Sequence, residues 1–175
     1  DSVSCPSRAF PPSTPAVAIL RYLAGVLGAD VVPTAGLTEL SAFKLFQPIT
    51  VFGDAGQGIS DLCDPLRLTW WTEGGLLYVL ADGESLPGQA VVVTPSEIPG
   101  AIRLYDTEPA DDGALRITCA LAASIRVGHL VTVADSEQRG TYRVESVRHT
   151  VDNRGGALST SAVIRDPTLA LLAGL

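Results

Sequence analysis

The chain has 175 residues, of which 46% are hydrophobic, and it carries a formal net charge of −7 at pH 7. This length and apolar content are enough to bury one good core or two small ones, and they exclude a disordered chain. The acidic balance argues against a nucleic-acid-binding domain, whose surface is normally basic, and against binding to an anionic membrane.

The sequence indicates neither a transmembrane helix nor a cysteine framework. The longest apolar run, 16–27, is too short to span a bilayer and contains Arg21. The three cysteines, Cys5, Cys63 and Cys119, are far apart and form no Cys-x-x-Cys pair, so they indicate neither a disulfide framework nor a zinc site. We expect Cys63 and Cys119 to be inert core residues, because a free cysteine behaves as a small hydrophobe.

Residues 1–14 are rich in proline and serine and predict an extended arm or linker. The segment that follows, 15–88, is predicted to be a helix-rich αββ domain. Its first helix has Pro15 at its first position, with Thr14 as the cap and Gly28 just past the end. Because this helix is apolar on nearly all sides, we expect it to be buried against its own domain or another subunit.

A second helix is predicted to begin after Asp54, whose side chain is the expected cap, with Gln57 bonding back to it. Its apolar positions recur at spacings of three and four residues along one face. Pro65 should end or kink this helix. In the segment before the helix, Pro48 permits only an edge strand.

A predicted hairpin of two strands, 67–72 and 76–81, completes the αββ unit, and the residues between them, Glu73 to Gly75, form the turn. Successive side chains of a strand point to opposite faces, so Trp70 and Trp71 should lie on opposite faces. One of them is expected in the core. The other is either a surface contact or covered by another subunit.

The remainder of the chain, 89–166, predicts an antiparallel β-barrel-like domain of about six short strands, which makes the whole chain α+β. Three of these strands, 130–135, 141–149 and 157–164, should pair with one another through two tight turns. An apolar C-terminal tail, 167–175, follows them and would promote association with other surfaces if it were exposed.

Alternation along the strand 141–149 places Tyr142 and Val144 on one face. Arg143 and Glu145 then lie on the other face. Around the two turns, four arginines cluster with three interspersed acids, namely Arg139, Arg143, Arg148 and Arg154 with Glu137, Glu145 and Asp152. We expect these charged residues to form cross-strand ion pairs or a seam between subunits, because the two signs are interspersed.

The histidines and the glycine-rich segments carry no catalytic or cofactor motif. No Gly-x-Ser-x-Gly elbow accompanies His129 or His149, and we expect His149 to hydrogen-bond a turn or a cross-strand partner. The glycines of 53–58 lack the Gly-Lys-Ser/Thr end of a phosphate loop, and the acidic loop 106–112 lacks the pattern of an EF-hand. We therefore expect no cofactor and no metal.

Several short motifs follow one another over roughly residues 15–165. They are Gly53-Asp54 opening a helix through Leu66, Leu68-Thr-Trp-Trp71, Glu73-Gly-Gly through Leu80, Gly83-Glu84, Val91-Val-Val-Thr-Pro95, Ile98-Pro-Gly100, Ile125-Arg126-Val127-Gly128, and the spaced set Gly140, Tyr142, Val144, Val147, His149 and Asp152. In this order they resemble the tail baseplate hub proteins of Mu-like and related tailed phages and prophages.

The resemblance implies a structural protein of the virion tail baseplate or tail tip, with no catalytic activity. Members of that family look like trimers whose barrel-like domains form a ring between the tail tube and the tip. The implied partners are other copies of this chain in a homotrimer, the tail tube protein, tail-tip spike or fibre proteins and phage DNA in passage, without a membrane. The implied structural or interface residues are Trp70, Trp71, Arg126, Tyr142, Arg143, Glu145, His149 and Asp152.

Two other functions stay open at this level. A tail-associated peptidoglycan hydrolase would need Asp61, Asp64 or Glu73 to converge in a cleft, although acids three residues apart on a polar helix face are usually solvated. A carbohydrate- or peptide-binding module would use Trp70 or Trp71 as a stacking platform.

Overall fold

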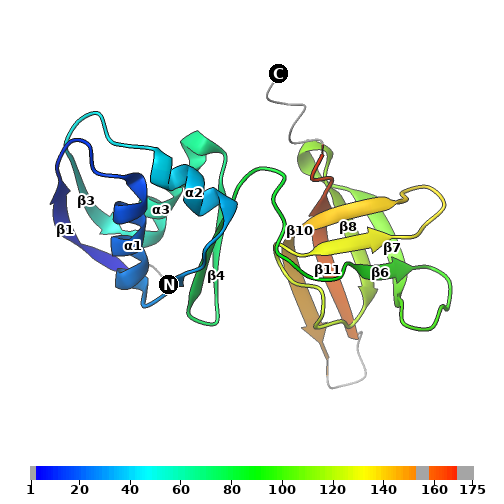
Figure 1. The fold of residues 1–175 in the computed structure, drawn as a ribbon. Coiled ribbons are helices and arrows are strands. Elements are labelled where there is room, and N and C mark those ends of the chain that lie inside the picture. Colours follow the sequence, from blue (N-terminus) through cyan, green and yellow to red (C-terminus); the bar gives the residue numbers. More distant parts are fainter. Residues whose placement is uncertain (1–2, 153–157, 169–175) are drawn as a thin grey trace. The chain divides into compact units, whose positions relative to one another are not determined.

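The computed structural model describes residues 3–152 and 158–168. The chain divides into two units, Asp1–Glu84 and Ser85–Leu175, each with a hydrophobic core of its own. Most helices and strands of the two units are labelled in Figure 1. Among the described residues, no helix has the length and apolar character needed to cross a bilayer. The predicted turn at Gly155–Gly156 and the last seven residues of the predicted tail lie outside the described residues.

Helix α1 (Ala16–Leu27) presents one buried face to the first core. It ends at Gly28, whose φ of 70° lets its N–H reach the carbonyl oxygens of the last turn. The predicted cap at Thr14 is wrong, because Pro15 occupies the N-cap position and makes no side-chain cap. The Thr14 hydroxyl instead donates to the Pro11 carbonyl oxygen at 2.6 Å, which closes the turn before the helix.

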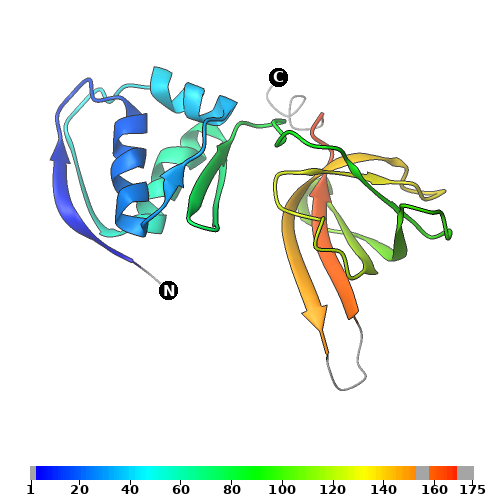
Figure 2. The same ribbon diagram turned by 60° about the horizontal axis from the view of Figure 1, so that its bottom comes forward.

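Residues predicted as an arm or linker form strand β1 (Ser4–Phe10), which pairs antiparallel with β3 (Ile49–Asp54). The two strands lie side by side in Figures 1 and 2. Cys5 and Phe10 are buried in the first core. The sheet has only these two strands, so among the described residues β3 has an edge with no strand beside it. The expected edge strand after Pro48 is thus confirmed.

Helix α3 (Ala55–Cys63) begins at Asp54, whose carboxylate accepts from the Gln57 backbone N–H at 2.8 Å. The predicted cap is confirmed. The Gln57 side chain, however, donates forward to Asp61 at 2.8 Å and not back to the cap. The 3-10 turn η1 (Asp64–Leu66) follows the helix and contains Pro65, as the sequence predicted for the end of the helix.

The predicted hairpin is formed by β4 (Thr69–Glu73) and β5 (Leu76–Leu80). Gly74 and Gly75 both have positive φ, 59° and 79°, which a two-residue turn of this handedness requires. A short strand, β2 (Asp30–Val31), adds to β5 in parallel, and helix α2 (Ala35–Ala42) packs against β5.

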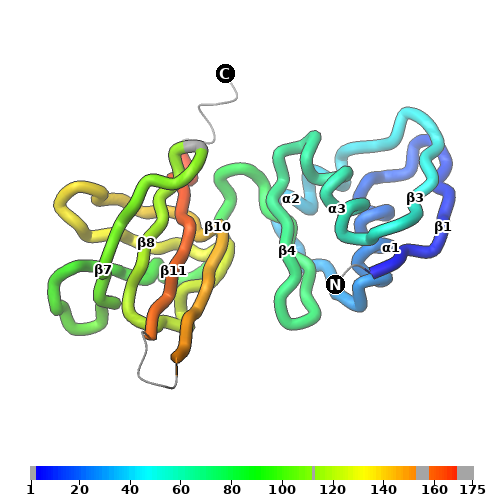
Figure 3. The backbone as a smooth tube through the Cα atoms, turned by 180° about the vertical axis from the view of Figure 1, so that it is seen from behind, coloured from blue at the N-terminus to red at the C-terminus, as the bar shows by residue number. Residues whose placement is uncertain are grey.

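The second unit is a closed barrel of six strands in the order β10-β11-β8-β7-β6-β9. Figure 3 shows β7, β8, β11 and β10 side by side. The strands are β6 (Val91–Thr94), β7 (Ile102–Pro109), β8 (Leu115–Ala120), β9 (Leu130–Val133), β10 (Gly140–Val151) and β11 (Leu158–Arg165), with the 3-10 turn η2 (Asp111–Gly113) between β7 and β8.

The α+β class and the barrel are therefore confirmed. The predicted strands in 130–164 pair antiparallel as β9, β10 and β11. The barrel is not antiparallel throughout, because β6 runs parallel to both of its neighbours, β7 and β9.

Candidate interaction surfaces

Strand β10 places its apolar and charged residues on different sides of the barrel wall. Val144 is buried in the barrel core and Tyr142 packs against that core, as the alternation predicted. Gly140 leaves room for the Tyr142 ring, since a Cβ at this position would lie 3.0 Å from it. A register shift between Val144 and Ser146 then leaves Glu145 as the extra residue of a β-bulge.

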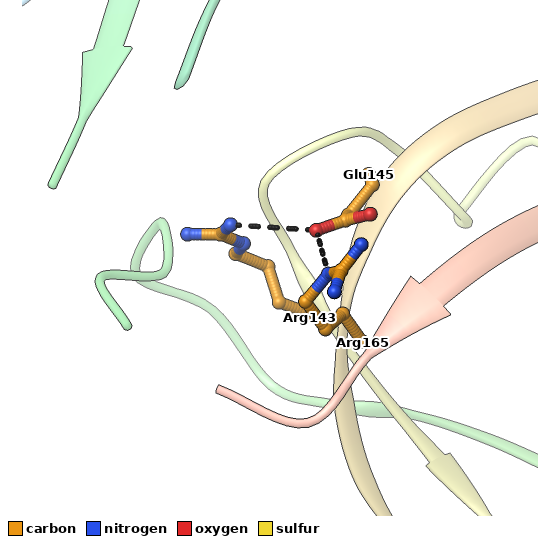
Figure 4. Close-up of polar contacts among 3 residues, drawn as sticks. All are labelled: Arg143, Glu145 and Arg165. Carbon is orange, nitrogen blue, oxygen red and sulfur yellow. Dashed lines mark hydrogen bonds and ion pairs between the residues drawn. The ribbon is translucent and has the colours of Figure 1, made fainter. Parts of the chain in front are cut away.

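Glu145 lies between two arginines on the outer side of this bulge (Figure 4). Its Oε1 is 2.7 Å from Nε of Arg165 and 3.7 Å from Nη2 of Arg143. Arg143 and Arg165 are direct cross-strand partners, and like charges in that position repel each other. The carboxylate offsets this repulsion, and it does so at a largely buried site, because the Arg143 side chain is only 6% exposed.

We expect Glu145→Gln to destabilise the barrel by about 2 kcal/mol, because it removes the anion from two partly buried guanidinium groups. Glu97→Gln is the matched control. Glu97 pairs with Arg103 at a similar distance, 3.3 Å, but its side chain is 85% exposed, so the expected change is below about 1 kcal/mol. Urea unfolding of both variants measures the difference, and equal losses would contradict the account of this cluster.

The other predicted residues of the barrel lie apart from this cluster. Nδ1 of His149 and the hydroxyl of buried Thr160 on β11 share a hydrogen bond of 2.9 Å, which confirms the expected cross-strand partner. Arg126 lies in the turn before β9, where its Nε donates to the carbonyl oxygen of Ala123 at 3.4 Å. Asp152 is exposed directly after β10.

Trp70 and Trp71 lie on opposite faces of the hairpin, as the sequence predicted. Trp70 packs against the first core, and its indole N–H donates to the Ser60 hydroxyl at 3.1 Å. Trp71 stacks on Tyr78 of β5 with a centroid distance of 4.9 Å and an interplanar angle of 8°. Trp71 is half-buried, so this outer aromatic pair is not an open stacking platform.

An apolar groove, here called the β3 groove, lies in the first unit. It has a volume of about 480 Å³ and lies between β3 and α3. Leu45, Ile49, Val51, Leu62 and Leu66 line it with apolar atoms, and Phe43 and Phe52 form exposed parts of its wall. This groove could not be predicted from the sequence, because the phenylalanines of 43–52 follow no helical or strand period.

The three carboxylates considered for hydrolysis do not share this groove. Asp61 lines the groove together with Asp54, whereas Asp64 and Glu73 are not part of its lining. All three of the residues considered, Asp61, Asp64 and Glu73, are exposed. In the described part of the chain, no three histidines, cysteines or acidic residues gather as a metal site.

The cysteines are buried and free. Burial raises the pKa of the Cys63 thiol to about 12, with a smaller contribution from the charge of Asp64, and burial raises the pKa of Cys119 to about 11. Both therefore stay protonated near neutral pH. Since the thiolate is the reactive form, the expectation that Cys63 and Cys119 are inert agrees with their surroundings.

These features define an α+β protein with a helix-and-hairpin unit followed by a closed six-stranded barrel. No protein-family model matches the sequence, and no curated protein matches it. The fold is similar to that of the solved tail protein from Neisseria meningitidis MC58, with a TM-score of 0.66 and 13% sequence identity, over 95% of this chain and 71% of that one.

Two further solved structures share the fold. The 43 kDa tail protein of prophage MuSo2 from Shewanella oneidensis has a TM-score of 0.57 and 12% identity, over 97% of this chain and 69% of that one. An E. coli component of the type VI secretion system, itself similar in structure to the T4 tail proteins gp27 and gp5, has a TM-score of 0.58 and 10% identity. That similarity covers 91% of this chain and 50% of the other. The chain thus has the fold of phage tail proteins.

Proposed function

We propose that this chain is a structural subunit of a phage or prophage tail baseplate hub. In this role it assembles as a homotrimer into a ring at the tail baseplate or tip of the virion, joins the tail tube protein to the spike or fibre proteins, and lets DNA pass. The observation that carries the proposal is the likeness of nearly the whole chain to two tail proteins, over 95% and 97% of its length.

The charge and the exposed apolar surface support an assembling ring. A basic channel wall would bind DNA phosphates and slow their passage, whereas a chain of net charge −7 does not favour such binding. Phe46 and Phe52 of the first unit are 94% and 72% exposed, and contacts between permanent subunits are typically large and apolar. The proposal assigns the chain no catalytic role.

We expect the purified full chain to have three times the mass of one chain by light scattering, with little dissociation on dilution, because obligate interfaces are extensive. A strict monomer at every concentration would contradict the hub. A monomer that also bound cell-wall sugars through the Trp71–Tyr78 pair would favour the binding module, and loss of a hydrolytic activity in Asp61→Asn would favour the enzyme.

A further inference from the structure

The β3 groove follows the unpaired edge of β3 and not one face of the strand. Ile49, Thr50, Val51 and Phe52 all line it, although successive side chains of a strand point to opposite faces. Because side chains from both faces of β3 line the groove, the groove must lie beside the strand, along its edge. In the described residues no strand pairs with β3 there, so its backbone N–H and C=O groups on that side are available to an extended segment.

The chemistry of the groove selects an uncharged apolar occupant. Its wall is largely apolar, and its ionisable lining residues are Asp54 and Asp61. Gln57 donates to both carboxylates, from its backbone N–H and from its side-chain amide. An acidic segment would be repelled by these carboxylates, and a charged segment of either sign would lose hydration against the apolar wall.

The chain itself contains a segment with these properties outside the described residues. Residues 169–175 read Leu-Ala-Leu-Leu-Ala-Gly-Leu and contain no charged side chain. In extended form, seven residues span about 23 Å, and the six residues of β3 span about 20 Å. Alternation would place Leu169, Leu171, Ala173 and Leu175 on one side and Ala170, Leu172 and Gly174 on the other, so the first side carries three leucines and the second carries one.

We propose that residues 169–175 of a second copy of this chain bind in the β3 groove as an added strand. The inference rests on the proposed function, because donation from each copy to the next is a head-to-tail contact, which closes into a ring when the rotation permits. It names the groove as one acceptor surface of the homotrimer. The bound segment would also cover Phe52 and the unpaired edge of β3, which would otherwise promote aggregation.

Cross-linking of two separately made full-length variants tests this contact. Phe52→Cys places a thiol on the exposed wall of the groove, and Leu171→Cys places one in the apolar segment. The native thiols are buried and should not compete. After the two variants are mixed and refolded together, a short bismaleimide should join them into a species of two chains.

Two controls make the result specific. Val151→Cys, at a residue that is 66% exposed on β10, replaces Phe52→Cys and should give no such species. Adding Leu169→Asp to the Leu171→Cys chain should abolish the link, because Leu169 lies on the same side of the strand as Leu171 and a carboxylate is disfavoured in this groove. Equal linking with Val151→Cys would overturn the inference. A chain that carries both Phe52→Cys and Leu171→Cys gives a second check, because a link formed only within that one chain would also overturn it.

Light scattering on the same samples separates the two levels of the proposal. A trimer that shows no link between Phe52→Cys and Leu171→Cys chains contradicts the inference and leaves the hub intact. A monomer without the link contradicts both.

Discussion

Gly36→Ala should destabilise the first unit by about 3 kcal/mol, because the added methyl group has no space. Gly36 lies in the first turn of α2, where the helix contacts the end of β5. A Cβ there would lie 2.7 Å from the Val79 carbonyl oxygen and 2.8 Å from the Ala81 nitrogen. These are backbone atoms, so relief requires α2 to move away from the sheet.

Gly25→Ala is the matched control for this substitution. Gly25 lies inside helix α1, and a Cβ at that position would meet no atom within 4 Å. Alanine in a helix interior is favoured over glycine by about 0.5–1 kcal/mol, so this variant should be slightly more stable than the parent chain. Denaturant unfolding followed by tryptophan fluorescence measures both. A Gly36→Ala variant as stable as Gly25→Ala would contradict the close packing of α2 on β5.

Glu84→Ala should cost about 3 kcal/mol at the same junction, because one carboxylate serves three backbone donors. Oε1 accepts from the Ala35 N–H at 2.7 Å, and Oε2 accepts from the N–H groups of Gly36 and Ala81 at 3.0 and 2.8 Å. The carboxylate thus joins the start of α2 to the residue after β5. It also places a negative charge at a helix N-terminus, where the peptide dipoles favour it.

Glu84→Gln should lose about half as much as Glu84→Ala, since the amide keeps one acceptor oxygen but not the charge. Glu39→Ala is the matched control, because Glu39 is an exposed glutamate on α2, the helix that Glu84 holds. Its removal should change the free energy of unfolding by less than about 0.5 kcal/mol. Thermal unfolding of the three variants gives the order. If Glu84→Ala were as mild as Glu39→Ala, the anchoring role of this carboxylate would be wrong.

Local signals predicted the elements that depend on local chemistry. The Asp54 cap, the turn at Gly74–Gly75 and the end of α1 at Gly28 each follow from the conformational needs of a few neighbouring residues. Strand alternation alone predicted that Trp70 and Trp71 lie on opposite faces of the hairpin. Such features need no knowledge of what lies across the sheet.

Features that depend on distant pairing could not be predicted in the same way. Strand β1 forms by pairing with β3, whose partner residues lie 39 to 50 positions further along the chain, and proline-rich residues 1–14 show no strand period of their own. The direction of β6 is set by the connections before and after it, and a four-residue apolar run does not encode direction.

The candidate surfaces were predictable only in part. Ion pairing on the outer face of β10 followed from the interspersed charges, but the bulge at Glu145 and the burial of Arg143 did not, because a bulge breaks the alternation on which the prediction rested. The β3 groove was missed because it is formed by residues from a loop, a strand and a helix. Nothing in the sequence around Glu84 indicates the three backbone donors that its carboxylate binds.

Electron microscopy of the assembled tail, at a resolution that distinguishes β-strands, tests the central claim most directly. The account predicts three copies of this chain in a closed ring at the junction between tail tube and tip, around an open channel. Copies located on the outside of the tail, or a single copy bound to a cell-wall fragment, would contradict a hub.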